Sequence, residues 1–143
     1  MLVYKGPGDI FTLDTELKVC PVNVVGVMGN GLALAFKKRY PYVYAEYRVR
    51  CLQGQLKIGG LFVKDGVVCF PTKKEWWRPS RVEYLQASFE QLVEYCNEHK
   101  VKTLAIPAVG CGYGKGDIKE VELMVDYYLG QSFATKVWFL TKK

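Results

Sequence analysis

The chain has 143 residues, half of them hydrophobic, and a formal net charge of +6. This composition excludes a disordered or low-complexity protein, and the length suits one domain with a sizeable core. The excess of Lys and Arg favours a polyanionic partner such as a nucleotide or nucleic acid, although ordinary solubility accounts for a charge of this size equally well.

The cysteine content and the absence of a long apolar run indicate which cellular compartment and which kinds of site to expect. The five cysteines are odd in number and form no C-x-x-C pair, and the single histidine, His99, stands in a polar stretch at a predicted helix end. We therefore expect buried free thiols in a reducing compartment, with no metal or other cofactor. No apolar run approaches the roughly 18 residues of a membrane span, and the N-terminus has no signal-peptide pattern. We therefore expect a soluble, cytoplasmic protein that makes no membrane contact.

The first predicted strand covers residues 2–5, and glycines and a proline end it. Asp9 follows directly, ahead of Ile10. An acidic side chain just past a strand end can accept a hydrogen bond from an exocyclic amine such as that of adenine. The alternative is a turn aspartate that bonds to its own backbone, and on this residue alone the alternative is favoured.

A glycine turn lies between the second predicted strand, residues 17–25, and a predicted helix over residues 32–40. Gly26, Gly29 and Gly31 permit positive φ and a close approach to the backbone. A turn that leads into a helix N-terminus directs several N–H groups at one point, which favours an anion such as a phosphate. The spacing matches neither the P-loop nor the dinucleotide-binding fingerprint, so a tight turn without a ligand is an equal alternative.

A further helix is predicted from Pro41 to about Leu52, and we interpret its tyrosines and arginines as a packing surface in preference to a nucleic-acid face. A hairpin with Asp65-Gly66 as its type I′ turn follows.

The next loop, residues 71–80, carries Lys73 and two adjacent tryptophans. A lysine at such a place is a rim charge or, where partly desolvated, a nucleophile or electrostatic catalyst. The tryptophans either stack on a base or pack over the edge of the core, which is the commoner arrangement.

The C-terminal half repeats the pattern of strand, glycine loop and helix. Ser80 and Glu83 predict a capping box for a helix that runs to about residue 98. A buried strand over residues 103–107 leads into a second glycine loop, residues 108–116. Asp117 is placed to cap a last helix that ends near residue 129, and residues 137–140 form the final strand.

Strands thus alternate with helices, and the glycine-rich loops follow the strands. This order predicts an α/β layered domain with a ligand crevice at the carboxyl ends of the strands. Two glycine loops on one crevice would suit a nucleotide diphosphate, with Lys73 as the candidate for chemistry.

Taken together, these stretches resemble the macro domain family, and the resemblance spans essentially the whole chain. It is carried in order by Gly8-Asp9-Ile10-Phe11, by Asn23 through Ala33, by Pro71-Thr72-Lys73-Lys74 with Trp77 through Arg81, and by Ile106-Pro107 with Gly110 through Gly114. The resemblance implies an α/β fold, three-layer α/β/α with a mixed central sheet, formed as a single domain over residues 1–143 that binds ADP-ribose. The similarity is greatest to the branch of terminal ADP-ribose protein glycohydrolase, and within it to the antitoxin macro domains that remove ADP-ribose from thymidine in DNA.

The resemblance also implies roles for individual positions. The implied ligand-binding residues are Asp9, Ile10, Asn23, Gly26, Val27, Met28, Gly29, Asn30, Gly31, Leu32, Thr72, Gly110, Cys111, Gly112, Tyr113 and Gly114. Among them, Asp9 and Ile10 would hold the adenine, and the two glycine loops would enclose the diphosphate and the distal ribose from opposite sides. Lys73 would act at the anomeric carbon of that ribose, as a nucleophile on the opened sugar or as a proton donor. The protein glycohydrolase has an aspartate where this chain has Gly114, whereas the DNA-directed antitoxins carry an acid at the place of Asp117. Asp117 is therefore either the second implied catalytic residue or a plain helix cap.

The implied function is an ADP-ribosyl glycohydrolase that removes ADP-ribose from a macromolecule, with a thymidine base of DNA favoured over a protein carboxylate. The alternatives are a phosphatase acting on ADP-ribose 1″-phosphate and a non-catalytic ADP-ribose-binding module. The implied partner is ADP-ribose or an ADP-ribosylated macromolecule, with single-stranded DNA as one candidate. We expect the chain to be a monomer.

Overall fold

A six-stranded sheet forms the centre of the computed structural model, which describes residues 1–112 and 116–141. The strand order is β1-β6-β5-β2-β4-β3, and every neighbouring pair is parallel except β3 and β4. The strands are β1 (Leu2–Pro7), β2 (Leu17–Asn23), β3 (Phe62–Lys64), β4 (Val67–Lys73), β5 (Thr103–Pro107) and β6 (Lys136–Thr141). The mixed central sheet of the sequence analysis is therefore confirmed.

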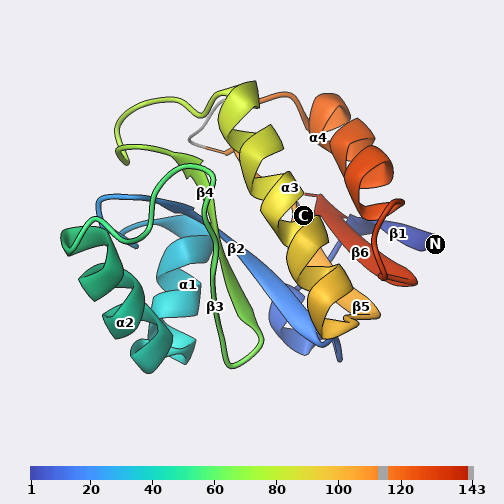
Figure 1. Ribbon diagram of the computed structural model, residues 1–143, viewed down its shortest axis with the longest axis horizontal. Helices are drawn as coiled ribbons and strands as arrows, with labels where there is room; N and C mark the ends of the chain where they lie inside the picture. The colour runs from blue at the N-terminus through green and yellow to red at the C-terminus, as the bar shows by residue number, and fades with distance from the viewer. Residues whose placement is uncertain (113–115, 142–143) are drawn as a thin grey trace.

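Helices cover both faces of this sheet (Figure 1). One face packs against α1 (Gly31–Arg39) and α2 (Pro41–Leu52), and the other against α3 (Val82–His99) and α4 (Ile118–Met124). A short 3-10 helix, η1 (Ile10–Thr12), follows β1, and a π-helical turn, η2 (Val125–Leu129), extends α4. The molecule is thus a three-layer α/β/α domain, as predicted.

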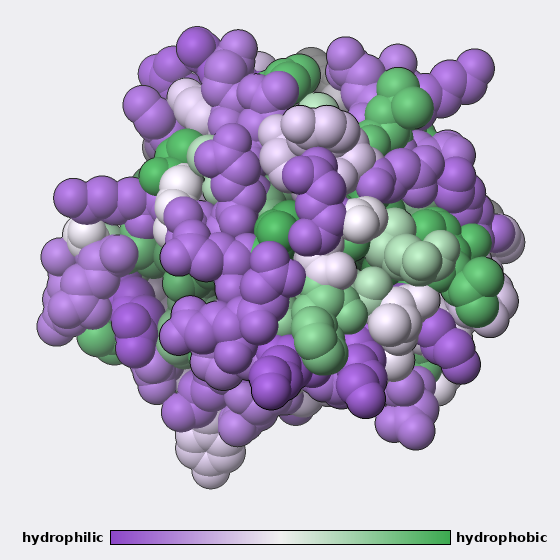
Figure 2. Space-filling view, turned by 45° about the vertical axis from the view of Figure 1, so that its right-hand side comes forward, coloured by the Kyte–Doolittle hydropathy of each residue, from purple (hydrophilic) through white to green (hydrophobic). Residues whose placement is uncertain are grey.

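Alternating side chains of the central strands explain why both faces are buried. On β4, Val68 and Phe70 join the core under α3, whereas Val67 and Cys69 join the core under α1 and α2. A strand that is buried on both faces reads as a continuous apolar run, because successive side chains point to opposite faces. The face of the molecule shown in Figure 2 is mainly hydrophilic, with apolar side chains gathered in smaller groups. Within the two described stretches, no helix combines the length and the apolar character that crossing a bilayer requires.

Most predicted elements are confirmed, including the hairpin turn, where both Asp65 and Gly66 have positive φ. The predicted capping box is wrong. The first residue of α3 is Val82, and its N-cap, Arg81, makes no side-chain cap bond. The Ser80 hydroxyl instead donates to the Gly110 carbonyl across the domain, at 3.1 Å. The second strand also ends two residues earlier than predicted, at Asn23, because the side chain of Asn23 bends the following backbone into a turn.

Candidate functional site

The loops after β2, β4 and β5 leave the same edge of the sheet, because these three strands are parallel neighbours. They are the first glycine turn (residues 24–30), the tryptophan loop (residues 74–81) and the second glycine loop (residues 108–117). In an open α/β sheet, the crevice outside the carboxyl ends of the strands is the usual place for a ligand. These three loops therefore form the candidate site.

A single buried amide shapes the first glycine turn. The Asn23 side chain is 4% exposed, and its Oδ1 accepts from the N–H groups of Val25 and Gly26 at 3.1 Å and of Val27 at 3.3 Å. Its Nδ2 donates to the Val27 carbonyl at 2.8 Å. The amide therefore takes the place of a strand partner for the turn backbone, and the turn is rigid before any ligand arrives.

Two residues of α2 support the same turn, and the sequence analysis did not identify them as such. The Tyr47 hydroxyl, fully buried, lies 2.9 Å from the Asn23 carbonyl and 3.0 Å from its Oδ1. Burial raises the pKa of Tyr47, so its hydroxyl stays protonated and remains a donor. Arg48 Nη1 donates to the Gly26 carbonyl at 3.1 Å. The first turn is thus held from below by α2 as well as by β2.

The glycines of this turn differ in what surrounds them. Gly26 has a φ of 90°, and a Cβ there would meet Arg48 and Cys51 at 3.4 Å. Gly31 has a φ of 55°, and a Cβ there would meet nothing within 4 Å. The space beside Gly31 is therefore open to a ligand at the N-terminus of α1. The N-cap, Asn30, makes no side-chain cap bond, so the N–H groups of the first turn stay available.

The other predicted residues of this turn line it to different extents. Gly29 and Asn30 are exposed, Val27 and Leu32 are half-buried, and Met28 is buried in the core under α1 and α2.

A bulge brings Lys73 beside the first turn. The register of β2 against β4 shifts between Val22 and Asn23, so Val22 pairs with Pro71 and Asn23 pairs with Lys73. The skipped residue, Thr72, is 3% exposed and donates its hydroxyl to the Val22 carbonyl at 3.3 Å. The Thr72 side chain thus joins the two strands, and Lys73 is the last residue of β4, at the carboxyl end of the strand.

Desolvation by the surrounding protein lowers the pKa of the half-buried Lys73 amine. Among the described residues, no carboxylate forms an ion pair with it. A lysine with these properties has a larger neutral fraction than a surface lysine, and it is available to an incoming substrate.

The second glycine loop is held by backbone contacts and by Ser80. Gly110 has a φ of 75°, and a Cβ there would lie 2.8 Å from Ser80 Oγ, so only glycine fits. The Gly110 carbonyl accepts both the Ser80 hydroxyl and the Gly116 N–H, the latter at 2.7 Å. Gly112 is exposed and a Cβ there would meet nothing within 4 Å. Tyr113 and Gly114, both predicted to bind the ligand, lie outside the described residues.

Cys111 is not a reactive thiol in this loop. Burial, with the charges of Asp117 and Glu120, raises its pKa to about 11. The other four cysteines are buried free thiols, in agreement with the prediction. Within the described residues, no group of three or more His, Cys, Asp or Glu side chains could hold a metal ion.

Asp117 caps α4, as predicted. Its Oδ1 accepts from the Lys119 N–H at 2.9 Å, and the residue is exposed. This bond accounts for the residue type at position 117 by helix capping alone.

Asp9 stands at the end of β1, where its Oδ1 accepts from the Phe11 N–H at 3.0 Å. The self-bonding turn weighed in the sequence analysis is therefore present, and within the described part of the chain the other carboxylate oxygen accepts no hydrogen bond. Phe11 packs edge-to-face on Phe36 of α1, with ring centroids 4.8 Å apart. Ile10 is buried in the same core. The predicted adenine end is thus joined to α1, which begins at the first glycine turn.

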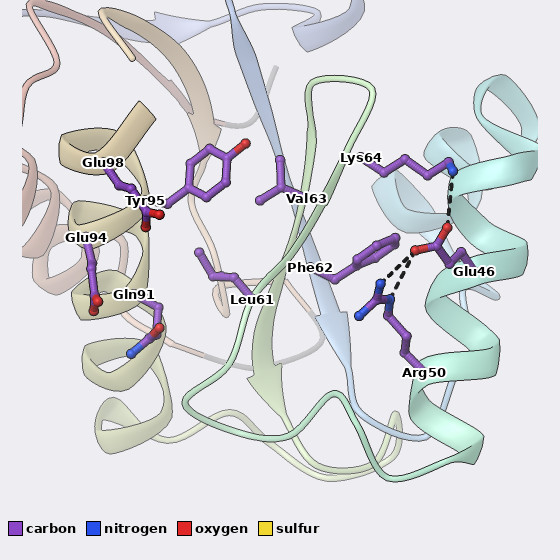
Figure 3. Close-up of a pocket in the computed structure, with 10 residues that line it drawn as sticks. All are labelled: Glu46, Arg50, Leu61, Phe62, Val63, Lys64, Gln91, Glu94, Tyr95 and Glu98. Atoms are coloured by element: carbon purple, nitrogen blue, oxygen red, sulfur yellow. Dashed lines mark hydrogen bonds and ion pairs between the residues drawn. The ribbon is translucent and has the colours of Figure 1, made fainter. Parts of the chain in front are cut away.

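Of two pockets in the structure, one lies beside this crevice and the other lies away from it. One, of about 420 Å³, adjoins the first turn and is lined by Val24, Val25, Lys57, Ile58, Lys74 and Glu75. The other, of about 520 Å³, lies between α2 and α3 over β3 (Figure 3). In that pocket Arg50 and Lys64 are both bound to Glu46, at 3.0 and 3.1 Å, and they lower the pKa of its carboxyl. We place the site at the glycine loops because its cation, Lys73, is unpaired within the described residues.

The chain is similar to known proteins over most of its length. The sequence matches the family described as Macro domain over residues 19–125. It is 40% identical over 130 residues to the DNA ADP-ribosyl glycohydrolase of Mycobacterium tuberculosis, and this alignment covers 85% of this chain and 37% of that protein. It is 37% identical over 139 residues to the protein of the same name from Thermus aquaticus, covering 92% of this chain and 39% of that protein. The chain thus spans less than half the length of these curated relatives.

Solved structures lead to the same family. The macrodomain of Mycobacterium tuberculosis DarG superposes with a TM-score of 0.92 at 35% identity, covering 97% of both chains. Thermosipho africanus DarTG in complex with ADP-ribose superposes with a TM-score of 0.84 at 28% identity, covering 93% of this chain and 40% of that one. With the family match, the fold and the two glycine loops in agreement, this chain belongs to the macro domain family.

Proposed function

We propose that this domain binds ADP-ribose between its two glycine loops and hydrolyses the bond that joins ADP-ribose to a base in DNA. The observation that carries the proposal is the bulge between β2 and β4, which sets the half-buried Lys73 opposite Asn23, at the base of the first turn. An amine at this position can reach the sugar whose phosphates the turn binds. The names of the relatives, DNA ADP-ribosyl glycohydrolase, support the choice of a DNA base as the leaving group.

Binding is proposed to rest on backbone donors. The N-cap of α1 makes no side-chain cap bond and the space beside Gly31 is open, so the N–H groups and the positive end of the helix would favour the diphosphate there. The open space beside Gly112 provides the matching room on the other side. Asp9, with one free carboxylate oxygen, accepts the exocyclic amine of adenine.

Lys73 is proposed as the catalytic residue at C1″ of the distal ribose. Breaking the bond from C1″ to the base leaves positive charge on the sugar and negative charge on the base. As a proton donor, Lys73 protonates the departing base while water adds to C1″. As a nucleophile on the opened sugar, in which the C1″–O4″ bond is broken and O4″ carries a proton, its neutral Nζ adds to C1″. The base leaves with a proton from Nζ, and a protonated C1″=Nζ imine remains. Water then adds to C1″, the C1″–Nζ bond breaks, and O4″ closes onto C1″ again as ADP-ribose is released.

The dependence of kcat/KM on pH separates these two roles. The deciding property is the protonation state of Lys73, whose pKa desolvation holds below the ordinary value. A nucleophile must be neutral, so activity would rise with pH up to that lowered pKa. A proton donor must be charged, so activity would fall with pH through the same value.

The first test is turnover on three substrates: an oligonucleotide ADP-ribosylated on thymidine, a protein ADP-ribosylated on glutamate, and ADP-ribose 1″-phosphate. We expect release from the oligonucleotide to be fastest. Lys73→Ala should bind ADP-ribose normally and lose about 100-fold or more in turnover, the usual contribution of a positioned acid or base. Lys38→Ala, an exposed lysine near the end of α1, is the control. Full turnover by Lys73→Ala would refute the assigned role, and faster release from either other substrate would replace the DNA assignment.

The second test concerns the binding turn. Gly31→Glu puts a carboxylate at the proposed phosphate position, and we expect calorimetry to show at least a 100-fold loss of ADP-ribose affinity through repulsion and blockage. Gly54→Glu is the matched control, because Gly54 also has positive φ, 69°, and a Cβ there would also meet nothing within 4 Å. Equal affinities in the two variants would show that the first turn has only a structural role.

A further inference from the structure

Two tryptophans stand exposed on the tryptophan loop, next to Lys73 in sequence. Trp76 is 52% exposed and Trp77 is 59% exposed, and their rings meet edge to face with centroids 5.3 Å apart. Large aromatic side chains mostly bury their faces in a core, so two adjacent indoles in solvent are unusual for a domain with cores as complete as these. The commoner arrangement weighed in the sequence analysis, packing over the core edge, is not the one observed.

The tryptophan loop is fixed at both ends to the two glycine loops. At its start, the Lys74 carbonyl accepts the Val24 N–H of the first turn at 3.0 Å. At its end, the Ser80 hydroxyl donates to the Gly110 carbonyl of the second loop at 3.1 Å. The loop therefore spans the mouth of the crevice, and its middle, which carries the tryptophans, arches away from the sheet toward solvent (Figure 1, the yellow-green segment leading from β4 to α3).

Positive charge accompanies the aromatic pair. Residues 73–81 carry four cations and one carboxylate, Glu75, which is bound to Arg78 at 2.7 Å. Lys74 Nζ and the Arg81 guanidinium each lie over the Tyr84 ring, at 5.9 and 5.8 Å from its centroid. These two cations and Arg78 are exposed, so phosphates from solution can reach them, although Arg78 also pairs with Glu75.

Exposed aromatic faces next to an excess of cations over carboxylates are the combination that single-stranded nucleic acid requires: bases stack on the rings and phosphates meet the cations. A duplex would not suit it, because its bases are already stacked. An apolar protein surface would suit the indoles but would leave the cations without partners. From this we propose that the tryptophan loop is a binding surface for single-stranded DNA, on which Trp76 and Trp77 stack on bases flanking the modified nucleotide while Arg78 and Arg81 contact the backbone.

This inference rests on the proposed function for the identity of the modified base, but the surface can be tested on DNA that carries no ADP-ribose. The two indoles would act as positioning residues, since they hold the strand and leave C1″ to the crevice. Their loss should therefore raise KM for a DNA-linked substrate and leave both kcat and the affinity for free ADP-ribose unchanged.

The experiment measures binding of an unmodified, fluorescein-labelled oligothymidine to the intact chain by anisotropy, together with quenching of tryptophan fluorescence. Trp138 stacks on Tyr4 in the sheet and provides the unquenched reference. We expect Trp76→Ala/Trp77→Ala to weaken binding by at least about tenfold and to abolish quenching, since each stacked base contributes at that scale. Arg78→Gln/Arg81→Gln should reduce the slope of log K against log salt by about 1.4, at about 0.7 for each single-strand phosphate contact.

Controls separate this surface from fold and from the crevice. Tyr42→Ala removes an aromatic ring that is 80% exposed on α2 and should leave DNA binding unchanged. Trp77→Phe keeps a stacking face and should recover most of the affinity lost in Trp77→Ala. Circular dichroism should show the same melting temperature for all variants, because the replaced side chains are exposed.

Three outcomes would overturn the inference. They are wild-type affinity of the tryptophan variant for oligothymidine, tighter binding of a duplex of equal length, and a parallel loss of ADP-ribose affinity in the tryptophan variant. Failure of the proposed function has a different signature. In that case ADP-ribose would give no saturable heat in calorimetry while the oligonucleotide still bound and quenched the indoles.

Discussion

The two glycine loops occupy equivalent places after parallel strands, yet they are built in different ways. The first is organised by the buried amide of Asn23, which makes four hydrogen bonds to the backbone of the turn. The second is organised by close packing at Gly110, where a glycine carbonyl accepts from Ser80 and Gly116. One turn depends on a polar side chain beneath it, and the other depends on a missing Cβ.

This difference shows where each loop is vulnerable. A side chain that replaces strand pairing for three N–H groups cannot be removed without leaving buried donors unsatisfied. A glycine at φ 75° cannot be enlarged without strain and collision. The first loop should therefore be sensitive to deletion of atoms, and the second to their addition.

The largest expected effect comes from Asn23→Ala. Loss of the amide leaves the N–H groups of Val25, Gly26 and Val27 and the Tyr47 hydroxyl without this acceptor, in a site that is 4% exposed. We expect the free energy of unfolding to fall by about 3–4 kcal/mol. Urea denaturation measures it. Asn30→Ala, at an exposed asparagine without a side-chain cap bond, should change stability by less than about 0.5 kcal/mol. Similar values for the two variants would mean that Asn23 does not organise the turn.

Gly110→Ala tests the opposite vulnerability. The added Cβ would lie 2.8 Å from Ser80 Oγ and 3.3 Å from Leu85, at a positive φ, and we expect a loss of about 2–3 kcal/mol. Gly112→Ala, where the Cβ meets nothing within 4 Å, should be nearly neutral.

A double-mutant cycle identifies the contact responsible. Ser80→Ala should cost stability in the wild-type chain, because the bond to the Gly110 carbonyl is lost, but should cost less or even restore stability in the Gly110→Ala chain. Strict additivity of the two substitutions would show that the hydroxyl is not the group in collision.

Tyr47→Phe sharpens the comparison at a smaller scale. It removes only the hydroxyl that supports Asn23, so we expect a loss of about 1–1.5 kcal/mol. Tyr42→Phe, at an 80% exposed position, is the matched control and should be silent. Thermal unfolding of the two variants side by side would test this, and a silent Tyr47→Phe would show that the hydroxyl does not contribute to the support of Asn23.

Local patterns in the sequence predict the parts of the fold that local physics determines. Alternating apolar strands, helical periodicity and the Asp65-Gly66 pair place the elements within a few residues, because each depends on neighbours close in sequence. Asn23 and Asp117 also act on backbone groups within four residues, so a prediction from the sequence is possible for them.

The remaining features depend on contacts between distant segments. Tyr47 supports a turn 24 residues before it, and Ser80 bonds a carbonyl 30 residues after it. In the sequence Ser80 fits a capping box, and only the packed structure shows that the hydroxyl is used elsewhere. The bulge that sets Lys73 opposite Asn23 has no signal of its own, since register follows from how two strands fit together. The ligand-binding and catalytic roles of these residues remain predictions.

Lys73→Met gives the smallest expected effect. Desolvation lowers the pKa of the Lys73 amine in the folded state. At pH values between that lowered pKa and the ordinary one, the unfolded chain binds more protons than the folded chain does. The free energy of unfolding therefore rises with pH through this window. Below the window the charged amine is a slight burden on the fold. The uncharged Met should therefore be more stable than wild type near neutral pH, by less than about 0.5 kcal/mol because solvent screens a half-exposed group. The gain should shrink as pH rises through the window, which denaturation at a series of pH values can follow. A loss of stability in Lys73→Met would instead mean that the lysine side chain stabilises the bulge. The lysine would then have a structural role, and it would not be a destabilising residue that is present for catalysis.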